Sequence, residues 1–154
     1  MKKLLPALLA IMMMFSLISC GEEAKNPKAA DVMTKIRSEI EFPEMAEKTK
    51  DDLASFGYDE LDTADIEDCA YIIASSGLTA EEVFIVKLKD TGDVAAVKKM
   101  MEARRDQIAA TAQDYTPEEM DKITKAVIET KGRYAFFAIT GDNAKAKEIF
   151  KEMF

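Results

Sequence analysis

Two segments are apolar on both sides of an extended backbone, and they constrain the fold most strongly. The first, residues 82–89, places apolar side chains on alternating faces: Phe84, Val86 and Leu88 on one, Val83 and Ile85 on the other. The second, residues 134–140, reads YAFFAIT and is also apolar on both faces. Successive side chains of a strand point to opposite faces of a sheet. These strands are therefore either central and covered on both faces, or part of a sheet with one face partly open.

Each of these segments predicts the second strand of a β-hairpin. Residues 66–75, IEDCAYIIAS, are rich in strand-forming residues, and a short Ser-Gly connection leads from them to the strand at 82–89. A strand at 126–130 and a Lys-Gly turn before residues 134–140 predict the other hairpin, although DKITKAVIET also fits a helix. Short connections favour antiparallel pairing, so we expect two antiparallel hairpins.

The spacing of apolar residues predicts helices on either side of these hairpins. The first helix begins after Asp31 and ends at Pro43, and a short second helix closes near Gly57. The longest helix starts at Asp93, the expected N-cap. Its apolar stripe consists of Val94, Val97, Met101 and Ile108. This stripe would pack against one face of the sheet.

Two further helices complete the chain. Thr116 and Glu119 have the spacing of a capping box, with Pro117 in the first turn. Residues 143–154 carry an amphipathic stripe. The order is α-α-β-β-α-α-β-β-α, which predicts an α+β, two-layer domain. Its mostly antiparallel sheet has about four strands in two hairpins, with helices packed on it.

A short internal repeat accompanies the two hairpins. TGDVAAVKK, from Thr91, and TGDNAKAKE, from Thr140, each link an apolar strand to a helix. A glycine for the turn and an aspartate for the helix cap explain this similarity. A duplicated strand-strand-helix unit is the alternative.

The first twenty residues are organised like an export signal. Lys2 and Lys3 precede an apolar run, residues 4–18, that is short for a membrane-spanning helix. The run ends in LISCG, which resembles the lipobox of bacterial lipoproteins. In those proteins the cysteine, here Cys20, receives a diacylglyceryl group and becomes the first residue after cleavage. An ordinary secretory signal and an uncleaved anchor are the alternatives.

This interpretation divides the chain into three parts. We expect a lipoprotein signal peptide at residues 1–19, a polar tether at 20–30 and a single α+β domain at 31–154. Cys20 is the predicted lipid-attachment site. Two acyl chains are enough for stable anchoring, whereas one chain binds a membrane only marginally.

The charge of the chain excludes several classes of partner and site. The formal net charge is −8, and removal of residues 1–19 would make it −10. An acidic surface repels phosphate groups, so we expect no nucleic-acid partner. The sequence contains no histidine, which removes histidine general bases and most zinc sites.

No motif predicts catalytic residues, a cofactor or a metal site. The segment YDELDTADIEDC has an aspartate at every third position: Asp59, Asp62, Asp65 and Asp68. This spacing does not match a calcium-binding loop, and we interpret the segment as a solvated connector. Cys69 lies in an apolar strand and loses its only possible partner if Cys20 carries lipid. We therefore expect a buried, unpaired thiol.

Three charged pairs are the remaining candidates for chemistry: Glu81–Glu82, Glu118–Glu119 and Arg104–Arg105. Paired carboxylates can perform acid–base catalysis, but a helix start already explains the second pair. The arginine pair could bind an anion. It is also typical of the wet face of a helix, where it would pair with Glu102 or Asp106.

Four motifs follow the lipobox in a fixed order: FGYDE, LTAEEVFIVKLKD, DYTPEEM and KGRYAFFAIT. From about residue 31 to 154 this layout resembles the lipoprotein family known as domain of unknown function 4358. The resemblance implies an envelope lipoprotein of a Gram-positive bacterium. It assigns no catalytic residues, because the family has no assigned activity.

We therefore expect a lipid-anchored protein at the outer face of the cytoplasmic membrane. Its expected partners are the membrane and an unidentified envelope protein or ligand. The favoured function is a non-enzymatic binding or assembly module, and the alternative is a small carboxylate-dependent envelope enzyme. The expected binding surface is the sheet face that carries Val83 and Ile85, unless the helices of residues 31–57 cover it.

Overall fold

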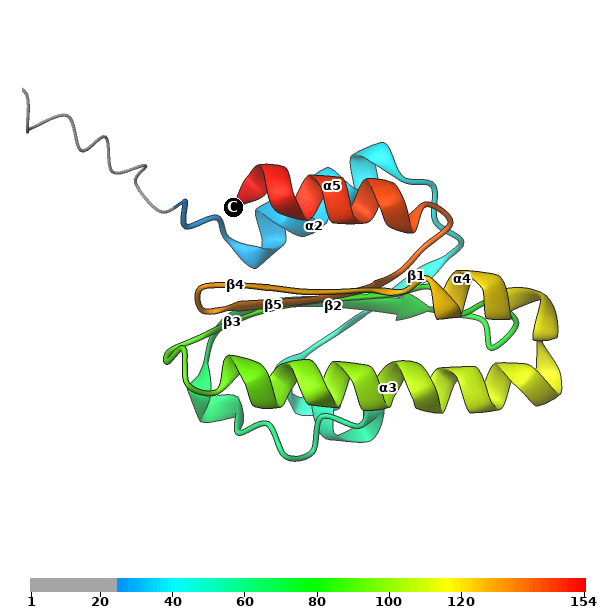
Figure 1. Cartoon of the computed structure of the whole chain (residues 1–154), viewed down its shortest axis with the longest axis horizontal. Coiled ribbons are helices and arrows are strands. Elements are labelled where there is room, and N and C mark those ends of the chain that lie inside the picture. Colours follow the sequence, from blue (N-terminus) through cyan, green and yellow to red (C-terminus); the bar gives the residue numbers. More distant parts are fainter. Residues whose placement is uncertain (1–24) are drawn as a thin grey trace, which may run out of the picture.

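The computed structural model describes residues 25–154. In this range a five-stranded antiparallel sheet lies between two layers of helices (Figure 1). The sheet order is β1-β2-β3-β5-β4. Its strands are β1 (Met45–Lys48), β2 (Ile66–Ala74), β3 (Glu82–Leu88), β4 (Val127–Lys131) and β5 (Tyr134–Ile139). The helices are α2 (Ala29–Glu39), α3 (Val94–Tyr115), α4 (Met120–Thr124) and α5 (Asn143–Met153), with short 3-10 helices η1 (Lys50–Phe56), η2 (Thr63–Asp65) and η3 (Pro117–Glu119).

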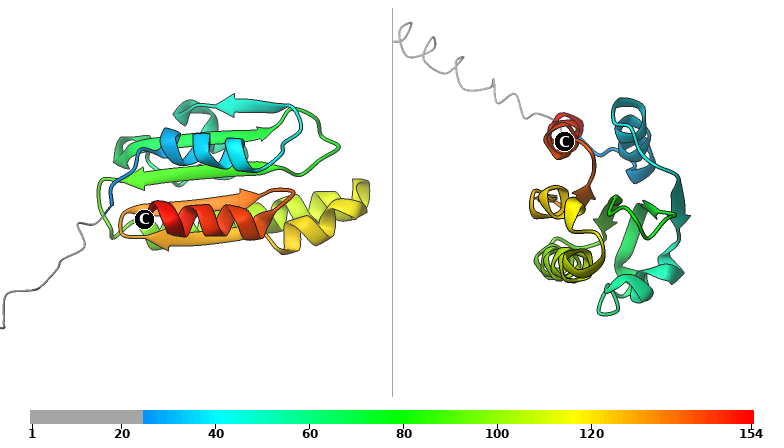
Figure 2. Two further views of the ribbon diagram at one scale, coloured as in Figure 1. Left: turned by 90° about the horizontal axis from the view of Figure 1, so that it is seen from above. Right: turned by 90° about the vertical axis from the view of Figure 1, so that its right-hand side faces the viewer.

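Each face of the sheet has its own hydrophobic core. On one face, Phe84, Val86 and Leu88 of β3 belong to a cluster with residues of η1, α3 and α4. On the other face, Val83 and Ile85 belong to a cluster with residues of α2 and α5. Figures 1 and 2 show α2 and α5 together above the sheet and α3 below it. The domain therefore has three layers rather than the two predicted.

The predicted open sheet face is wrong. Val83 and Ile85 are both fully buried, and α2 covers them together with α5. Of the two N-terminal helices expected as a second cover, only α2 takes that place. The 3-10 helix η1 lies on the opposite face, where its Leu53 belongs to the α3-side cluster. An apolar residue at both positions is thus explained by double burial of β3.

The predicted second helix is replaced by a strand and a 3-10 helix. β1 pairs antiparallel with β2 along the register Met45↔Ala74 to Lys48↔Tyr71, which makes the sheet five strands wide instead of four. Thr49 then starts η1, and its N–H and Oγ1 both donate to Asp52 Oδ2 at 2.8 Å. Gly57 ends η1, as predicted, with a left-handed φ of 84°.

Both predicted hairpins are confirmed. β2 and β3 pair antiparallel, and so do β4 and β5, with Lys131 opposite Tyr134. The segment DKITKAVIET, which also fitted a helix, is divided between a helix and a strand: α4 ends at Thr124, and β4 begins at Val127. The turn between Lys131 and Tyr134 needs a left-handed residue, which Gly132 supplies with a φ of 55°.

The two strand-to-helix repeats do not form a symmetric duplication. β3 and β5 are adjacent and antiparallel, so a two-fold axis relating them would have to keep each helix on the same sheet face. Instead α3 packs on one face and α5 on the other. The caps differ as well: Asp142 Oδ1 accepts from the Lys145 N–H at 2.9 Å, whereas Asp93 makes no side-chain cap bond.

Replacement of Ile85 with Ala tests the covered face. The side chain is fully buried under α2 and α5, so the variant should lose about 2–5 kcal/mol of unfolding free energy, measured by urea denaturation. Leu78→Ala is the matched control, because Leu78 is 73% exposed and its loss should stay within about 0.5 kcal/mol. Equal losses for the two variants would contradict the three-layer arrangement.

Candidate functional site

A groove of about 830 Å³ lies along β4, the strand at one edge of the sheet. Helix α3 forms one wall and α5 the other, and α4 closes one end. Figure 2 shows these three helices grouped on the β4 side of the sheet. We call this feature the β4 groove. Its lining residues are Lys98, Glu102, Arg105, Glu118, Asp121, Lys122, Lys125, Ala126, Val127, Ile128, Glu129, Thr140, Gly141, Asp142, Asn143, Ala144 and Lys147.

The strand register determines which main-chain groups of β4 face the groove. The Leu88 N–H donates to Arg133 O at 2.8 Å, and the paired residues of an antiparallel ladder alternate between bonding to one neighbour and to the other. On β5, every second residue counted from Arg133 therefore bonds to β3. The residues between them, Tyr134, Phe136 and Ala138, bond to β4. Their partners on β4 are Lys131, Glu129 and Val127.

It follows that Ile128 and Thr130 turn their N–H and C=O groups away from the sheet. β4 has no neighbouring strand on that side among residues 25–154. Four main-chain hydrogen-bonding groups of β4 therefore lie along this open edge, and the two of Ile128 belong to a residue that lines the groove. An edge of this kind is able to add another strand.

The walls of the groove carry charges of both signs. Its lining contains five cations and five carboxylates, although the chain as a whole has a net charge of −8. On the α5 side, Lys147 Nζ lies 2.5 Å from Glu129 Oε1. On the α3 side, Lys98 Nζ lies 3.7 Å from Glu102 Oε1, and Arg105 pairs with Asp106, the next residue in the chain.

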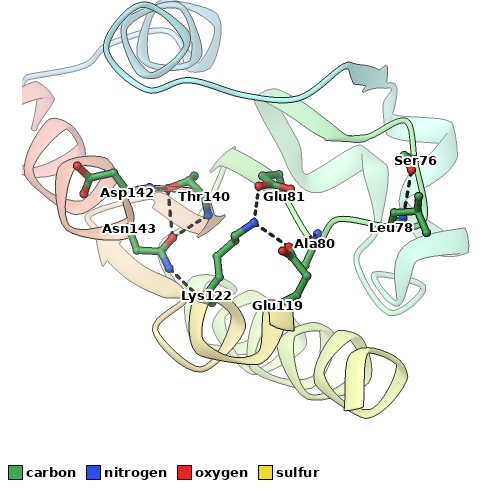
Figure 3. A network of polar contacts seen from close by, with 9 residues as sticks. All are labelled: Ser76, Leu78, Ala80, Glu81, Glu119, Lys122, Thr140, Asp142 and Asn143. Atoms are coloured by element: carbon green, nitrogen blue, oxygen red, sulfur yellow. Dashed lines mark hydrogen bonds and ion pairs between the residues drawn. The ribbon is translucent and has the colours of Figure 1, made fainter. Parts of the chain in front are cut away.

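The closed end of the groove is held by a network around Lys122 (Figure 3). Lys122 Nζ donates to Glu81 Oε1 at 2.5 Å and to Glu119 Oε2 at 2.7 Å. Glu119 Oε2 also accepts from the Ala80 N–H at 2.9 Å. A single ammonium group thus ties α4 to the loop that precedes β3.

A second group of bonds joins the same end of the groove to α5. The Thr140 N–H and Oγ1 both donate to Asn143 Oδ1, at 2.8 and 3.2 Å. Asn143 Nδ2 donates in turn to Lys122 O at 2.9 Å. Lys122 therefore links α4 to the start of β3 through its side chain and to the start of α5 through its backbone (Figure 3).

The predicted capping box at Thr116 is wrong because of this network. Thr116 makes no side-chain cap bond, and the Glu119 carboxylate binds Ala80 and Lys122 instead. Pro117 does occupy the first turn, as predicted. A tertiary contact with a main-chain N–H and an ammonium group has replaced the local cap.

The electrostatics of this network favour fixed charges over proton transfer. Burial would raise the pKa of Glu119, but hydrogen bonds from Lys122 and the Ala80 N–H outweigh it and hold that pKa below its ordinary value. Burial would likewise lower the pKa of Lys122, and its bonds to Glu119 and Glu81 more than offset this, so that pKa is raised. Both groups stay charged near neutral pH, which suits positioning better than general acid catalysis.

The carboxylates of the adjacent residues Glu81 and Glu82 bind different partners. Glu82 is 1% exposed and binds on the α3 side of the sheet, away from Lys122. Tyr71 OH donates to Glu82 Oε1 at 2.8 Å, and Arg104 donates to Glu82 through Nε and, at 2.8 Å, through Nη2. Each carboxylate of the predicted pair thus has its own cation.

The buried Glu82–Arg104 pair was missed by the sequence analysis. Arg104 was grouped with Arg105 as part of the wet face of α3, and that interpretation holds only for Arg105, which pairs with Asp106. The signal that could have found it is spacing: Arg104 falls three residues after Met101 and four before Ile108, on the apolar stripe itself.

Three acidic side chains of the aspartate-rich segment have structural roles. Asp62 accepts from the Ala64 N–H at 2.8 Å, Asp68 accepts from the Ala29 N–H at the start of α2 at 2.7 Å, and Glu67 pairs with Lys87 and Arg133. Within residues 25–154 no three acidic or cysteine side chains are grouped so as to hold a metal ion. The aspartate-rich segment thus connects elements of the fold.

The two cysteines fall in different parts of the chain. Cys69 is free and half-buried rather than fully buried, and burial raises the pKa of its thiol, with Lys50 opposing that shift. Cys20 and the predicted signal peptide lie outside the described residues. None of the helices in residues 25–154 is long and apolar enough to span a membrane.

Comparison with protein families gives a match to domain of unknown function (DUF4358) over residues 38–140. The chain belongs to this family. The matched range runs from the end of α2 through β5, so the DUF4358 region includes the Lys122 network and β4 itself. Helix α5, one wall of the groove, follows it. Searches of curated proteins and of solved structures gave no significant match.

Replacement of Arg104 with Met should destabilise the domain strongly, because Glu82 would keep a buried charge without its cation. We expect a loss of about 3–5 kcal/mol in urea denaturation. Arg105→Met is the matched control on the same helix, with an expected loss of about 0–1 kcal/mol. The double variant Glu82→Gln/Arg104→Met should recover part of the loss. Equal effects of the two arginine variants would refute the buried pair.

Proposed function

We propose that this DUF4358 protein is a lipid-anchored, non-enzymatic binding or assembly module at the outer face of the cytoplasmic membrane. The observation that carries the proposal is the sequence of the first twenty residues. A positive start, a short apolar run and the ending LISCG coincide there. Lipidation of Cys20 with two acyl chains would replace the apolar run as the membrane attachment.

The place where the described chain joins the domain supports this proposal. Lys25 Nζ donates to Glu152 O at 2.8 Å, and Tyr134 OH donates to Asn26 Oδ1 at 2.7 Å and to Pro27 O at 2.8 Å. The chain is therefore in contact with the domain from residue 25 onwards. The six residues from Cys20 to Lys25 would span at most about 20 Å. The domain would therefore lie close to the membrane.

The Lys122 network lies at the end of the domain away from residue 25, where the described chain begins (Figure 1). In Figure 1 the described chain begins at one end of the sheet, next to the C-terminus, whereas α4 and the end of α3 lie at the other end. A short tether at the first end would direct the α4 end away from the bilayer. This orientation favours binding of an envelope protein or another extracytoplasmic ligand.

The Lys122 network favours binding over the enzymatic alternative. That alternative needs a carboxylic acid with a raised pKa to act as a proton donor. The pKa of Glu119 is lowered instead, despite its burial, by Lys122 and the Ala80 N–H. Fixed, paired charges of this kind hold loops in place for recognition.

Replacement of Cys20 with Ala tests the anchor in the organism that makes the protein. The variant should be released from membranes or accumulate as uncut precursor, as measured by cell fractionation and by labelling with a radioactive fatty acid. Cys69→Ala is the matched control and should stay in the membrane fraction and keep its label. A Cys20→Ala variant that matures and remains tightly bound to membranes would show that the anchor assignment is wrong.

A further inference from the structure

We propose that the β4 groove binds an extended segment of a partner protein, which adds to the sheet as a sixth strand beside β4. The inference deepens the proposed binding function by naming its site and the form of its partner. The observation that supports it is the register of β4 against β5. Ile128 presents its N–H and C=O toward a groove of about 830 Å³, and Thr130 presents the same two groups along the same edge, beside a smaller pocket of about 230 Å³. Main-chain bonds of this kind supply the affinity when an extended peptide joins a sheet edge.

The groove has the form that a single added strand requires. β4 runs through five residues, Val127–Lys131, and α3 and α5 stand on either side of it on opposite sheet faces. An incoming strand would therefore be contacted on both of its faces. The Lys122 network closes one end and would limit how far the strand extends past Val127.

The opposite edge of the sheet differs from the β4 edge. β1 is four residues long, and the pocket of about 660 Å³ beside it includes Met45 as its only β1 residue, with the rest of its lining from residues 37–43. Among the outward residues of β1, Glu47 is ion-paired with Arg37 of α2 at 3.1 Å. The two edges therefore differ, which provides an internal control for the experiment.

A second copy of this chain is a poor occupant of the groove. The outward residues Ile128 and Thr130 would pair with Thr130 and Ile128 of the other copy. This register brings the two Glu129 residues directly opposite each other. Like charges facing each other across adjacent strands destabilise the pairing. The walls formed by α3 and α5 would also meet their counterparts.

The charges of the groove indicate which segment fits. On the α3 side the lining holds Lys98, Glu102 and Arg105. Lys98 is paired with Glu102, whereas the partner of Arg105, Asp106, lies outside the lining, so this wall carries one net positive charge. On the α5 side partner side chains would meet the Lys147–Glu129 pair, which is already neutral. We therefore infer an extended polypeptide with acidic residues on the side that faces α3 and uncharged residues on the other.

The experiment uses the full chain in detergent micelles and a displayed library of random peptides of about ten residues, long enough to span β4. Enriched peptides are synthesised and their affinity is measured by titration. Backbone hydrogen exchange is then followed with and without each peptide. The proposal expects enriched peptides with acidic residues at alternate positions that slow exchange at the Ile128 and Thr130 amides.

Proline variants decide whether the peptide adds to β4. Thr130→Pro removes an outward N–H but no bond to β5, and proline is tolerated at such edge positions. Peptide affinity should fall about tenfold or more. Glu47→Pro makes the same change at the outward side of β1 and should leave affinity unchanged. Thermal unfolding of both variants checks that the fold is retained. If Thr130→Pro unfolds the domain, N-methylation of alternate peptide amides gives the same test from the ligand side.

Three outcomes would overturn the proposal. The first is that no peptide is enriched, and the second is that enriched peptides bind Thr130→Pro as well as the unmodified chain. The third is protection of Ile128 and Thr130 that appears without peptide and rises with protein concentration, which would assign the edge to a second copy. None of these outcomes bears on the membrane anchor, which the Cys20 variant tests separately.

Discussion

Burial of β3 on both faces is the constraint on which the rest of the structure depends. All seven of its residues are buried, so the chain must supply a strand on each side and a helical layer above and below. Burial extends to the charged residues near its ends. Glu82 needs Arg104, and Lys87, 5% exposed, needs Glu67. A buried charge without its partner would lower the free energy of unfolding by several kcal/mol, or the group would become neutral through a shifted pKa at a similar cost.

Strand-forming apolar segments and short turns were enough to predict the hairpins, helical spacing of apolar residues was enough to predict the long helix, and together they gave the α+β class. It could not predict β1, because Met45–Lys48 is short and has no alternating pattern of its own; its strand conformation depends on pairing with β2. Nor does local sequence reveal long-range ion pairs. Glu119 has the spacing of a helix cap, yet it binds Ala80, 39 positions away. Whether a sheet face stays open was likewise not decided by local sequence, because the tertiary packing of α2 and α5 covers the face that carries Val83 and Ile85.

The groove is a consequence of the same arrangement. β3 and β5 occupy the middle of the sheet, which leaves β4 at one edge. The helices that follow β3 and β5 cover opposite faces on that side, and they become the two walls. Lys122 then fixes the closed end by joining α4 to both β3 and α5. A stable core and an accessible edge strand therefore arise from one topology.

Backbone hydrogen exchange of the full chain, with no peptide added, tests this account most directly. The amides of β3 should exchange only through global unfolding, because both neighbours and both helical layers protect them. Within β4, the amides of Ile128 and Thr130 should exchange much faster than that of Glu129, which bonds to β5. Slow exchange at all three β4 amides would mean that the edge is already covered. Fast exchange along β3 would contradict the doubly buried centre.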